Sequence, residues 1–485
     1  MRRRWHLPAG ERVVHRPRRE ELRPIHLRLL APRGPRRPRA TYWTVALLFF
    51  FLIAGGTALL MLPWATEQTT FTPFLTALFT ATSAVCVTGL VVVDTAGYWT
   101  TYGQVVIALL IFLGGLGIMT SATLLFILIG RRITLANRLL IQESMGTPRP
   151  GGVVRLVVNI VVITIAIQVV GFFVLWVILA TGAGGLTRAP LEAMGYAAFH
   201  AVSAFNNAGF DIFPHVEGGL PSVTRFQTHT GFMLVTILMA FLGAISYTVM
   251  RDVAMVRLRV KRYLLDTKIV LVVTGVLLLV GTPLIFITEF SNDATMGTLS
   301  LGDKLLNSFF FASISRTAGL ASASFADFHL ETGFFIMGLM FIGGASGSTA
   351  GGIKVNTFAV LLIAVLSSIR GRSQPVAFGR SIVPVQVYRA LVVVMVAGGI
   401  VFFTAILLTI TEDAAFFPIF FETVSAFGTV GLSRGITPDL STVGQIIITA
   451  AMFFGRLGPL TLALALAQQE EQSSYRYGEE RVKIG

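Results

Sequence analysis

Charged residues are scarce in this sequence. Asp, Glu, Lys and Arg make up only 13% of its 485 residues, whereas a soluble domain carries about 25%. Apolar residues account for 54% and the mean hydropathy is +0.76. Several apolar runs exceed the roughly 20 residues that a helix needs to cross a bilayer. The composition therefore excludes an ordinary soluble domain and predicts a membrane protein with several spans.

Other residue types and patterns that the sequence lacks exclude further classes of function. The single cysteine, Cys86, excludes an intrachain disulfide. His, Cys and acidic residues do not stand at metal-site spacing, and no cluster of acids or histidines falls at membrane depth, as a membrane enzyme would require. The first 40 residues have no apolar core, so no cleavable signal peptide is expected. We therefore predict that the chain is not an enzyme and binds no cofactor of its own.

Positive charge is concentrated in residues 1–40, which hold thirteen arginines against three acids. Such a segment is compatible with nucleic-acid binding, but also with a cytoplasmic anchor that touches anionic membrane lipid. A membrane span follows at once, which favours lipid over nucleic acid as the partner. A polar tail, residues 468–485, is also expected to be cytoplasmic.

Eight long apolar segments and four short ones follow one another along the chain in the order long, short, long, which is repeated four times. The predicted spans are residues 42–62, 101–130, 153–181, 228–250, 267–289, 333–369, 388–410 and 441–467. The short apolar helices, which cannot cross a bilayer, are residues 73–84, 191–204, 303–314 and 416–426. We predict an all-α membrane protein of eight transmembrane helices and four re-entrant pore half-helices. Its four helix–pore loop–helix repeats cover residues 41–132, 150–262, 265–372 and 385–467.

Loop charges predict the orientation. Basic clusters follow the second span of each of the first three repeats, at Arg131-Arg132, Arg251 to Arg262, and Arg370 to Arg372, while acids predominate on the opposite side. Cytoplasmic loops carry an excess of Lys and Arg. Both termini are therefore expected in the cytoplasm and the short helices on the outer side.

One motif recurs after every short helix, at intervals of 110 to 120 residues. Its copies are Ser83-Ala-Val-Cys-Val-Thr-Gly-Leu90, Ser203-Ala-Phe-Asn-Asn-Ala-Gly-Phe210, Ser313-Ile-Ser-Arg-Thr-Ala-Gly-Leu320 and Ser425-Ala-Phe-Gly-Thr-Val-Gly-Leu432. Four copies of one short apolar helix, each running into an extended glycine-containing segment, suggest four walls around one axis.

These segments have the chemistry of a cation filter. Non-helical backbone at membrane depth is tolerated where it lines water or an ion path, and glycine permits the left-handed angles that turn successive carbonyls inward. The segments contain no acid, so carbonyl coordination of a monovalent cation fits better than a carboxylate ring. Packing loops without an ion are the alternative. The predicted filter residues are Cys86, Val87, Thr88, Gly89, Asn206, Asn207, Ala208, Gly209, Arg316, Thr317, Ala318, Gly319, Gly428, Thr429, Val430 and Gly431.

A second feature recurs inside the second span of each repeat. It reads Phe112-Leu-Gly-Gly-Leu-Gly117, Phe241-Leu-Gly-Ala-Ile-Ser246, Phe341-Ile-Gly-Gly-Ala-Ser346 and Phe453-Phe-Gly-Arg-Leu-Gly458. Small residues allow helices to pack closely in membranes. We therefore expect at least three of these spans to approach a short helix closely.

The chain resembles the pore subunit of the Trk/Ktr/HKT superfamily of potassium transporters over about residues 42–467. The resemblance rests on the stretch from Thr82 to Asp94-Thr95, on the copy at Ser203–Phe210, and on Gly343-Gly-Ala-Ser-Gly-Ser-Thr-Ala-Gly-Gly-Ile-Lys354. With eight predicted spans the chain is most similar to the bacterial Ktr-type membrane subunit. The resemblance implies a pseudo-four-fold potassium filter with one glycine per repeat, at Gly89, Gly209, Gly319 and Gly431. Plant relatives that prefer sodium carry Ser at the first of these positions, so Gly89 favours potassium.

The resemblance also implies a location and partners. It places the chain in the bacterial cytoplasmic membrane, as a homodimer on a cytosolic ring of nucleotide-binding RCK-domain subunits. Potassium would pass down its electrochemical gradient, and sodium is a candidate activator. A sodium-selective or sodium-coupled transporter of the same fold is the rival function, which Cys86, Asn206 and Asn207 could favour.

The glycine-rich stretch 343–352 interrupts an apolar run and is a poor helix former. It lacks the Gly-Lys-Ser/Thr ending of a phosphate-binding loop. In the resembling family this segment is an intramembrane loop that lies under the filter and acts as a gate; a static kink is the alternative. The expected gate residues are Gly343, Gly344, Ser346, Gly347, Ser348, Thr349, Gly351, Gly352, Lys354 and Arg456.

Arg456 lies in the middle of a predicted span, where an arginine is costly and marks a functional site by default. We expect it below the filter, either raising the barrier to cations or holding the glycine-rich loop through its carbonyls. An ion pair with Glu422 is the alternative. Arg316 is expected to point behind the filter as a strut, and His200 to be a packing residue.

Overall fold

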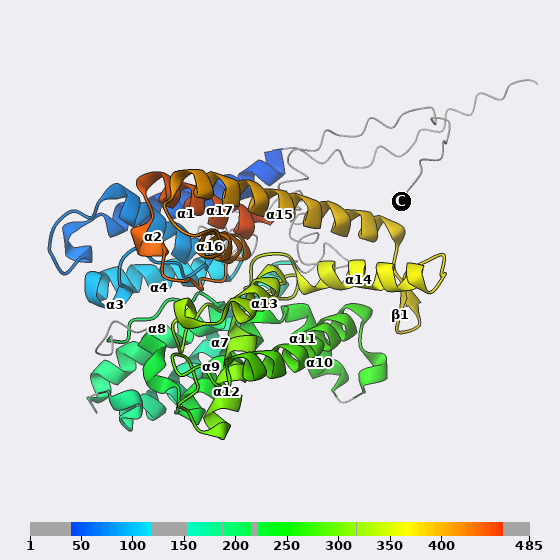
Figure 1. Cartoon of the computed structure of the whole chain (residues 1–485), viewed down its shortest axis with the longest axis horizontal. Helices are drawn as coiled ribbons and strands as arrows, with labels where there is room; N and C mark the ends of the chain where they lie inside the picture. The colour runs from blue at the N-terminus through cyan, green and yellow to red at the C-terminus, as the bar shows by residue number, and fades with distance from the viewer. Residues whose placement is uncertain are drawn as a thin grey trace, which may run out of the picture. The chain divides into compact units, whose positions relative to one another are not determined.

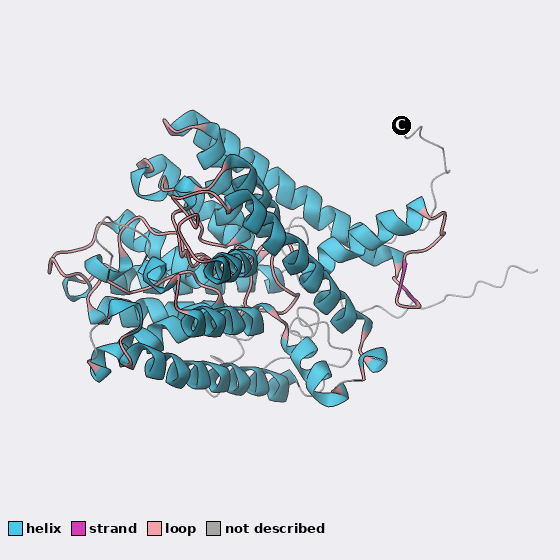
Figure 2. Ribbon diagram, turned by 60° about the horizontal axis from the view of Figure 1, so that its bottom comes forward, coloured by secondary structure: helices cyan, strands magenta, loops and turns pink. Residues whose placement is uncertain are grey.

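The computed structural model describes residues 40–117, 153–186, 189–214, 222–257, 259–316 and 318–458. Fifteen α-helices lie in these ranges, and one small hairpin holds the strands found there (Figure 2). The predicted all-helical, membrane-type class is thus confirmed for this part of the chain.

Twelve of the helices form four triplets of helix, short helix and helix (Figure 1). The first triplet is α1 (Ala40–Leu60), α2 (Phe74–Cys86) and α4 (Thr101–Gly115), and the second is α7 (Val153–Ala180), α8 (Pro190–Asn206) and α9 (Thr230–Ala244). The third is α11 (Leu265–Glu289), α12 (Leu301–Ile314) and α13 (Leu330–Phe341), and the fourth is α15 (Pro384–Thr411), α16 (Phe416–Gly428) and α17 (Thr442–Leu457).

The triplets pack in a closed cycle. In the first, second and fourth triplets the short helix lies against both of its flanking helices, and in the third α12 lies against α11. Between triplets, α4 packs on α8, α9 on α12, α13 on α16, and α17 returns to α2. The last helix of every triplet therefore covers the short helix of the next, and the ends of the four short helices meet around one centre.

Within the described residues, three helices are long and apolar enough to cross a membrane, over Arg155–Ala180, Leu265–Glu289 and Pro384–Thr411. A fourth candidate is the pair α9 and α10 (Tyr247–Val256), which is bent by 101°. This bend corrects the continuous span predicted over 228–250. The physical cause is a neighbouring loop, because backbone N–H groups of Ala345 and Thr349 donate to the carbonyls of Ala244 and Gly243.

The remaining elements lie in the segments that join the helices, either within a triplet or between triplets. They are α3 (Thr95–Tyr98), α14 (Val355–Ile369) and the short 3-10 helices Pro63–Ala65, Ala183–Gly185, Ser222–Phe226 (η3), Val260–Arg262, Phe325–Asp327 (η5) and Thr437–Asp439 (η6). The hairpin pairs β1 (Val376–Ala377) with β2 (Arg380–Ser381) in antiparallel register. Its turn residues Phe378 and Gly379 both have positive φ, as a two-residue hairpin requires.

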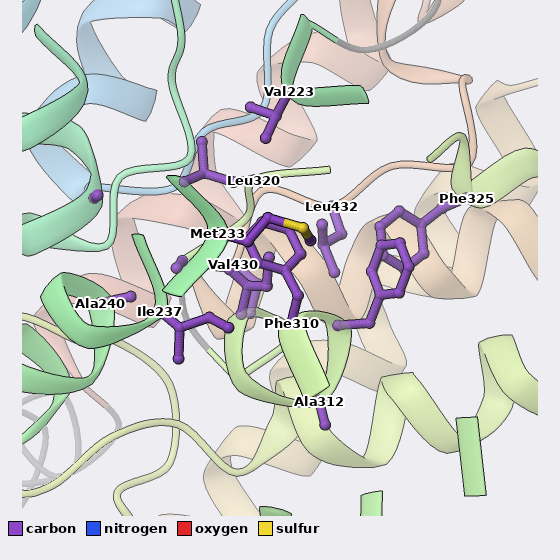
Figure 3. Close-up of a cluster of buried hydrophobic side chains, with 14 of the residues drawn as sticks. Val223, Met233, Ile237, Ala240, Phe310, Ala312, Leu320, Phe325, Val430 and Leu432 are labelled. Atoms are coloured by element: carbon purple, nitrogen blue, oxygen red, sulfur yellow. The ribbon is translucent and has the colours of Figure 1, made fainter. Parts of the chain in front are cut away.

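Apolar side chains surround the four meeting segments. Leu90, Phe210, Leu320 and Leu432 each follow a motif glycine, and each is only 1% exposed. Figure 3 shows Leu320, Val430 and Leu432 in one cluster with Met233 and Phe310, which come from the second and third triplets. The recurring Leu or Phe thus anchors each segment in the core.

Some predictions fall outside the described residues. These are the basic tail over 1–39, the stretch 118–150 with Arg131-Arg132, Thr317 in the third filter segment, and residues 459–485 with the polar tail.

Candidate functional site

Three of the four short helices end in the same way. The helix closes with a left-handed residue at Val87, Asn207 or Thr429, and the next residue donates back to the carbonyl of Ser83, Ser203 or Ser425. This is the Schellman arrangement, in which glycine or asparagine normally occupies the left-handed position. Val87 and Thr429 are β-branched, and β-branched residues rarely adopt positive φ. Such strain persists only where the surroundings enforce it, and it clusters at functional sites.

The third short helix ends differently. Ser315 keeps right-handed angles, and Ala318 donates to the carbonyl of Ile314. Arg316 follows at once and is 5% exposed. Its Nη2 donates to the carbonyl of Gly343 at 3.1 Å. Arg316 thus contacts the start of the glycine-rich loop as a strut.

The four motif glycines form a ring. Gly89, Gly209, Gly319 and Gly431 all have positive φ, at 93°, 72°, 62° and 93°. A methyl group on Gly89 would lie 2.5 Å from the carbonyl oxygen of Ala208, and one on Gly209 would lie 3.2 Å from that of Ala318. Gly319 faces the carbonyl of Val430, and Gly431 faces the carbonyl of Thr88, which closes the circle.

In the first and fourth triplets the recurring Ser connects the short helix to the N–H of its ring glycine. The Oγ atoms of Ser83 and Ser425 accept from the N–H groups of Gly89 and Gly431, both at 3.1 Å. In the first segment the N–H groups of residues 87, 88 and 89 therefore all donate to the helix end. A trans peptide points its C=O opposite to its N–H. The carbonyls of residues 86, 87 and 88 consequently point away from the helix end, and that of Thr88 faces Gly431 in the ring.

Sequence reasoning gave this Ser no role, although its recurrence six residues before each glycine was visible. In the second segment Ser203 Oγ donates instead to the carbonyl of Phe210, at 2.5 Å. In the third, Ser313 Oγ donates to Phe309 within its own helix. The residue recurs four times, but its bond to the glycine N–H is made in two copies.

The small-residue motif marks close helix contacts, as predicted. A methyl group on Gly114 would overlap the carbonyl oxygen of Val85, one on Gly243 that of Phe205, and one on Gly455 that of Phe427. Three of the four spans thus touch the end of a short helix through a bare glycine. In the third repeat the corresponding Gly343 faces the carbonyl of Gly351.

The glycine-rich loop is closed at its neck. Ile342 and Ile353 form an isolated parallel bridge, and the N–H of Gly343 donates to the carbonyl of Ile353 at 2.8 Å. The helix α13 therefore stops at Phe341 and α14 begins at Val355. Gly347 and Gly352 have positive φ, which a helix does not accommodate.

Thr349 joins the loop to the second segment. Asn207 Nδ2 donates to Thr349 Oγ1 at 2.8 Å, and Thr349 Oγ1 donates to the carbonyl of Gly243 at 2.9 Å. On the other side of the loop, a methyl group on Gly351 would overlap Thr429 Oγ1. The loop therefore lies against the ends of the second and fourth short helices.

Two cations also contact this loop. Arg456 Nη1 donates to the carbonyl of Thr349, and its Nη2 donates to the carbonyl of Gly114 in α4. Lys354 Nζ donates to the carbonyl of Ala350. Glu422 instead accepts hydrogen bonds from Ser433 and Thr437. Arg456 thus joins one carbonyl of the loop to one carbonyl of α4. The described contacts of Glu422 do not support the alternative ion pair.

The remaining candidates pack around the ring. Cys86 is buried in an apolar cluster with Leu90 and Met452, so its thiol belongs to the core between the first and fourth triplets. Asn206 Nδ2 donates to its own helix at Val202, at 2.8 Å. His200 Nε2 bonds Thr236 Oγ1 at 3.0 Å, and its ring lies 4.8 Å from that of Phe232. His200 is a packing residue.

Among the described residues, no group of three or more His, Cys, Asp or Glu side chains could hold a metal ion. The polar atoms that lie nearest to the ring glycines are the backbone carbonyl oxygens of Thr88, Ala208, Ala318 and Val430. Such groups suit a partly dehydrated monovalent cation.

Comparison with known proteins identifies the family. Residues 28–477 match the model of the TrkH family, described as cation transport protein. The chain is 42% identical over 444 residues to the Ktr system potassium uptake protein B of Bacillus subtilis (strain 168), covering 91% of this chain and 96% of the relative. It is 36% identical over 447 residues to the potassium/sodium uptake protein NtpJ of Enterococcus hirae, with the same coverage of both chains.

A solved structure has a similar fold. The crystal structure of the potassium transporter TrkH from Vibrio parahaemolyticus superposes with a TM-score of 0.68 at 19% identity, over 90% of this chain and 86% of that one. The sequence match and the fold agree, and the resemblance seen in the motifs is confirmed. The chain belongs to the TrkH family of cation transport proteins, which are multi-pass membrane transporters and not enzymes.

Proposed function

We propose that this chain is the potassium-translocating pore subunit of a potassium uptake system. The observation that carries the proposal is the closed ring of four left-handed glycines, each of which faces a carbonyl of the next segment. The similar proteins from Bacillus subtilis and Vibrio alginolyticus are named potassium uptake proteins, which supports potassium as the transported cation.

The ring performs selection by replacing water. A potassium ion that enters sheds part of its hydration shell, and carbonyl oxygens take the place of the lost water. The four short helices direct their C-terminal ends, the negative ends of their dipoles, at the same centre. In this proposal the ion moves through the ring passively, down its electrochemical gradient.

The membrane arrangement is part of the proposal. We place eight transmembrane helices and four re-entrant half-helices in a bacterial cytoplasmic membrane, with both termini in the cytoplasm. The basic residues after α9, from Arg251 to Arg262, and those after α14, Arg370 and Arg372, support this orientation.

The glycine-rich loop acts as the gate under the filter. Its contacts with Asn207, Gly243 and Arg456 support this role, because they hold the loop in one of its conformations. Opening requires these bonds to break together. Lys354 adds a positive charge beside the loop, which opposes the passage of cations while the loop is in place.

In this proposal, separate subunits regulate the cation flux. We propose a homodimer on a cytosolic ring of RCK-domain subunits that bind nucleotide, with sodium as an activator of flux. The phrase "Ktr system" in the names of the similar uptake proteins supports a separate regulatory component.

A sodium-selective or sodium-coupled transporter is the second candidate. The name of the Enterococcus hirae relative, a potassium/sodium uptake protein, favours it. The two functions share the fold and differ in which cation the ring accepts.

Cation flux into liposomes separates these candidates. The purified chain is reconstituted, and potassium, rubidium, sodium and lithium fluxes are compared at equal gradients. Potassium and rubidium flux well above sodium supports the proposal, and sodium flux above potassium supports the second candidate. Equal flux of all four ions contradicts a selective filter.

A further inference from the structure

The turn that follows the fourth filter segment is held by two charged side chains, Glu422 and Arg434. Ser433 and Arg434 stand two and three residues after the ring glycine Gly431. Ser433 Oγ donates to Glu422 Oε2 at 2.7 Å, and Arg434 Nη2 donates to the carbonyl of Ala326 at 2.7 Å. The turn is thus tied to its own short helix on one side and to another triplet on the other.

Arg434 bridges the third and fourth triplets. Its Nη2 also donates to the carbonyl of Phe328 at 3.2 Å, so one guanidinium nitrogen holds two carbonyls of the η5 region. Its Cζ lies 5.2 Å from the ring centre of Phe417 in α16. A planar guanidinium that stacks on an aromatic ring while it donates to backbone is a geometry lysine does not reproduce.

Glu422 holds the other side of the turn. It is 0% exposed in the middle of α16. Thr437 Oγ1 donates to Glu422 Oε1, and Ser433 donates to Oε2, so each carboxylate oxygen has a hydroxyl donor. A buried carboxyl is costly unless it is hydrogen-bonded. The two hydroxyl donors therefore offset the cost of burying Glu422, and the same hydrogen bonds hold the turn after Gly431.

In the other three segments the residue three positions after the ring glycine is uncharged. Val92 packs on an apolar cluster that includes Leu440, and Ile212 belongs to a cluster that includes Trp99. Ser322 Oγ donates to Asn307 Oδ1 at 3.0 Å. Each of these turns packs against, or hydrogen-bonds to, a neighbouring element. In the described structure the fourth turn does so through the charged side chains of Glu422 and Arg434.

We infer that Arg434 and Glu422 are positioning residues that set where the carbonyls of the fourth filter segment lie, and hence how well the ring discriminates potassium from sodium. Discrimination by carbonyls depends on where they are held, and the ring closes through this segment, because Val430 faces Gly319 and Gly431 faces Thr88. The inference rests on the proposed function.

The test is the ratio of potassium to sodium flux in liposomes for Arg434→Gln and Arg434→Lys. Gln removes the charge and the stacking, and we expect it to lower the ratio about threefold or more, while potassium flux persists. Lys keeps the charge but not the planar contact, and we expect an intermediate ratio. Glu422→Gln keeps the size of the side chain but offers one acceptor oxygen, so its ratio should fall as well. Arg225→Gln removes a positive charge from the outer loop of the second triplet and is the matched control.

The outcomes separate the two proposals. Wild-type flux without preference for potassium overturns the proposed function and this inference with it. Wild-type preference with an unchanged ratio in Arg434→Gln and Glu422→Gln, even if both variants melt at lower temperature, overturns this inference alone and leaves a structural role. If either variant does not fold, Arg434→Lys and Thr437→Val are measured instead, and an unchanged ratio in both has the same meaning.

Discussion

Gly209 differs from the other three ring glycines in the space around it. An added methyl group would lie 3.2 Å from its nearest neighbour, whereas on Gly319 or Gly431 it would overlap a carbonyl oxygen. All four glycines have positive φ, which costs other residues about 1–2 kcal/mol. The backbone penalty is thus common to the four, while the steric penalty is not.

We therefore predict an order of tolerance to alanine. Gly209→Ala should retain the most potassium selectivity, Gly89→Ala less, and Gly319→Ala and Gly431→Ala the least. Selectivity is measured as the ratio of rubidium to sodium flux in liposomes, after each variant is shown to elute like the wild type. Gly209→Ala as the most damaging of the four would contradict the ring geometry.

Arg456 donates to two carbonyls, Thr349 in the loop and Gly114 in α4. A hydrogen bond to a charged group contributes about 1.5–3 kcal/mol. We predict that Arg456→Gln frees the loop and raises potassium flux through the purified chain alone. Arg251→Gln, a basic residue of α10, serves as the control in the same flux assay. Lower flux in Arg456→Gln with a folded protein would show that the arginine holds the loop open.

At the scale of elements, glycines decide how closely helices approach. A methyl group on Gly455 would overlap the carbonyl oxygen of Phe427, while Gly398 in α15 has no atom within 4 Å of such a group. Overpacking costs about 1–3 kcal/mol, and alanine in an open helix position gains roughly 0.5–1 kcal/mol over glycine.

We predict opposite effects for these two substitutions. Gly455→Ala should lower the melting temperature in detergent and reduce flux, because α17 must move away from the C-terminal end of α16. Gly398→Ala should leave the flux unchanged and raise the melting temperature slightly. Equal melting temperatures for the two variants would argue against close packing at Gly455.

Helix positions were predictable from the sequence, but their interruptions were less so. The short helices begin and end close to the predicted residues, because apolar runs of that length have clear limits. The break after Ala244 was missed, since its cause is a hydrogen-bonding loop a hundred residues later. The hairpin at Val376–Ser381 was also missed, because its two-residue strands leave almost no periodic signal.

At the scale of the whole chain, the recurring motif predicted four segments around one axis. It could not predict the order in which they touch, which follows from α4, α9, α13 and α17 each covering the next short helix. Nor did it predict that the third helix would end differently. The sequence predicted Arg316 as a strut, but it did not predict that the strut would contact the carbonyl of Gly343.

The ring and its loop lie within residues 40–458, so selectivity should not depend on the basic tail. We predict that a chain lacking residues 2–39 keeps its potassium-to-sodium flux ratio, and that nucleotide added to the chain alone changes neither flux. Membrane recovery of the shortened chain is measured in parallel, to test the anchoring role. A changed flux ratio would show that the tail acts on the pore itself.

The most direct test is to locate the ion. Crystals of the chain in rubidium salt, measured at the rubidium absorption edge, would reveal bound ions by their anomalous scattering. We predict a peak at the centre of Gly89, Gly209, Gly319 and Gly431, coordinated by carbonyl oxygens of the four segments. A peak elsewhere with an empty ring would contradict the carbonyl filter, even if the chain conducts potassium.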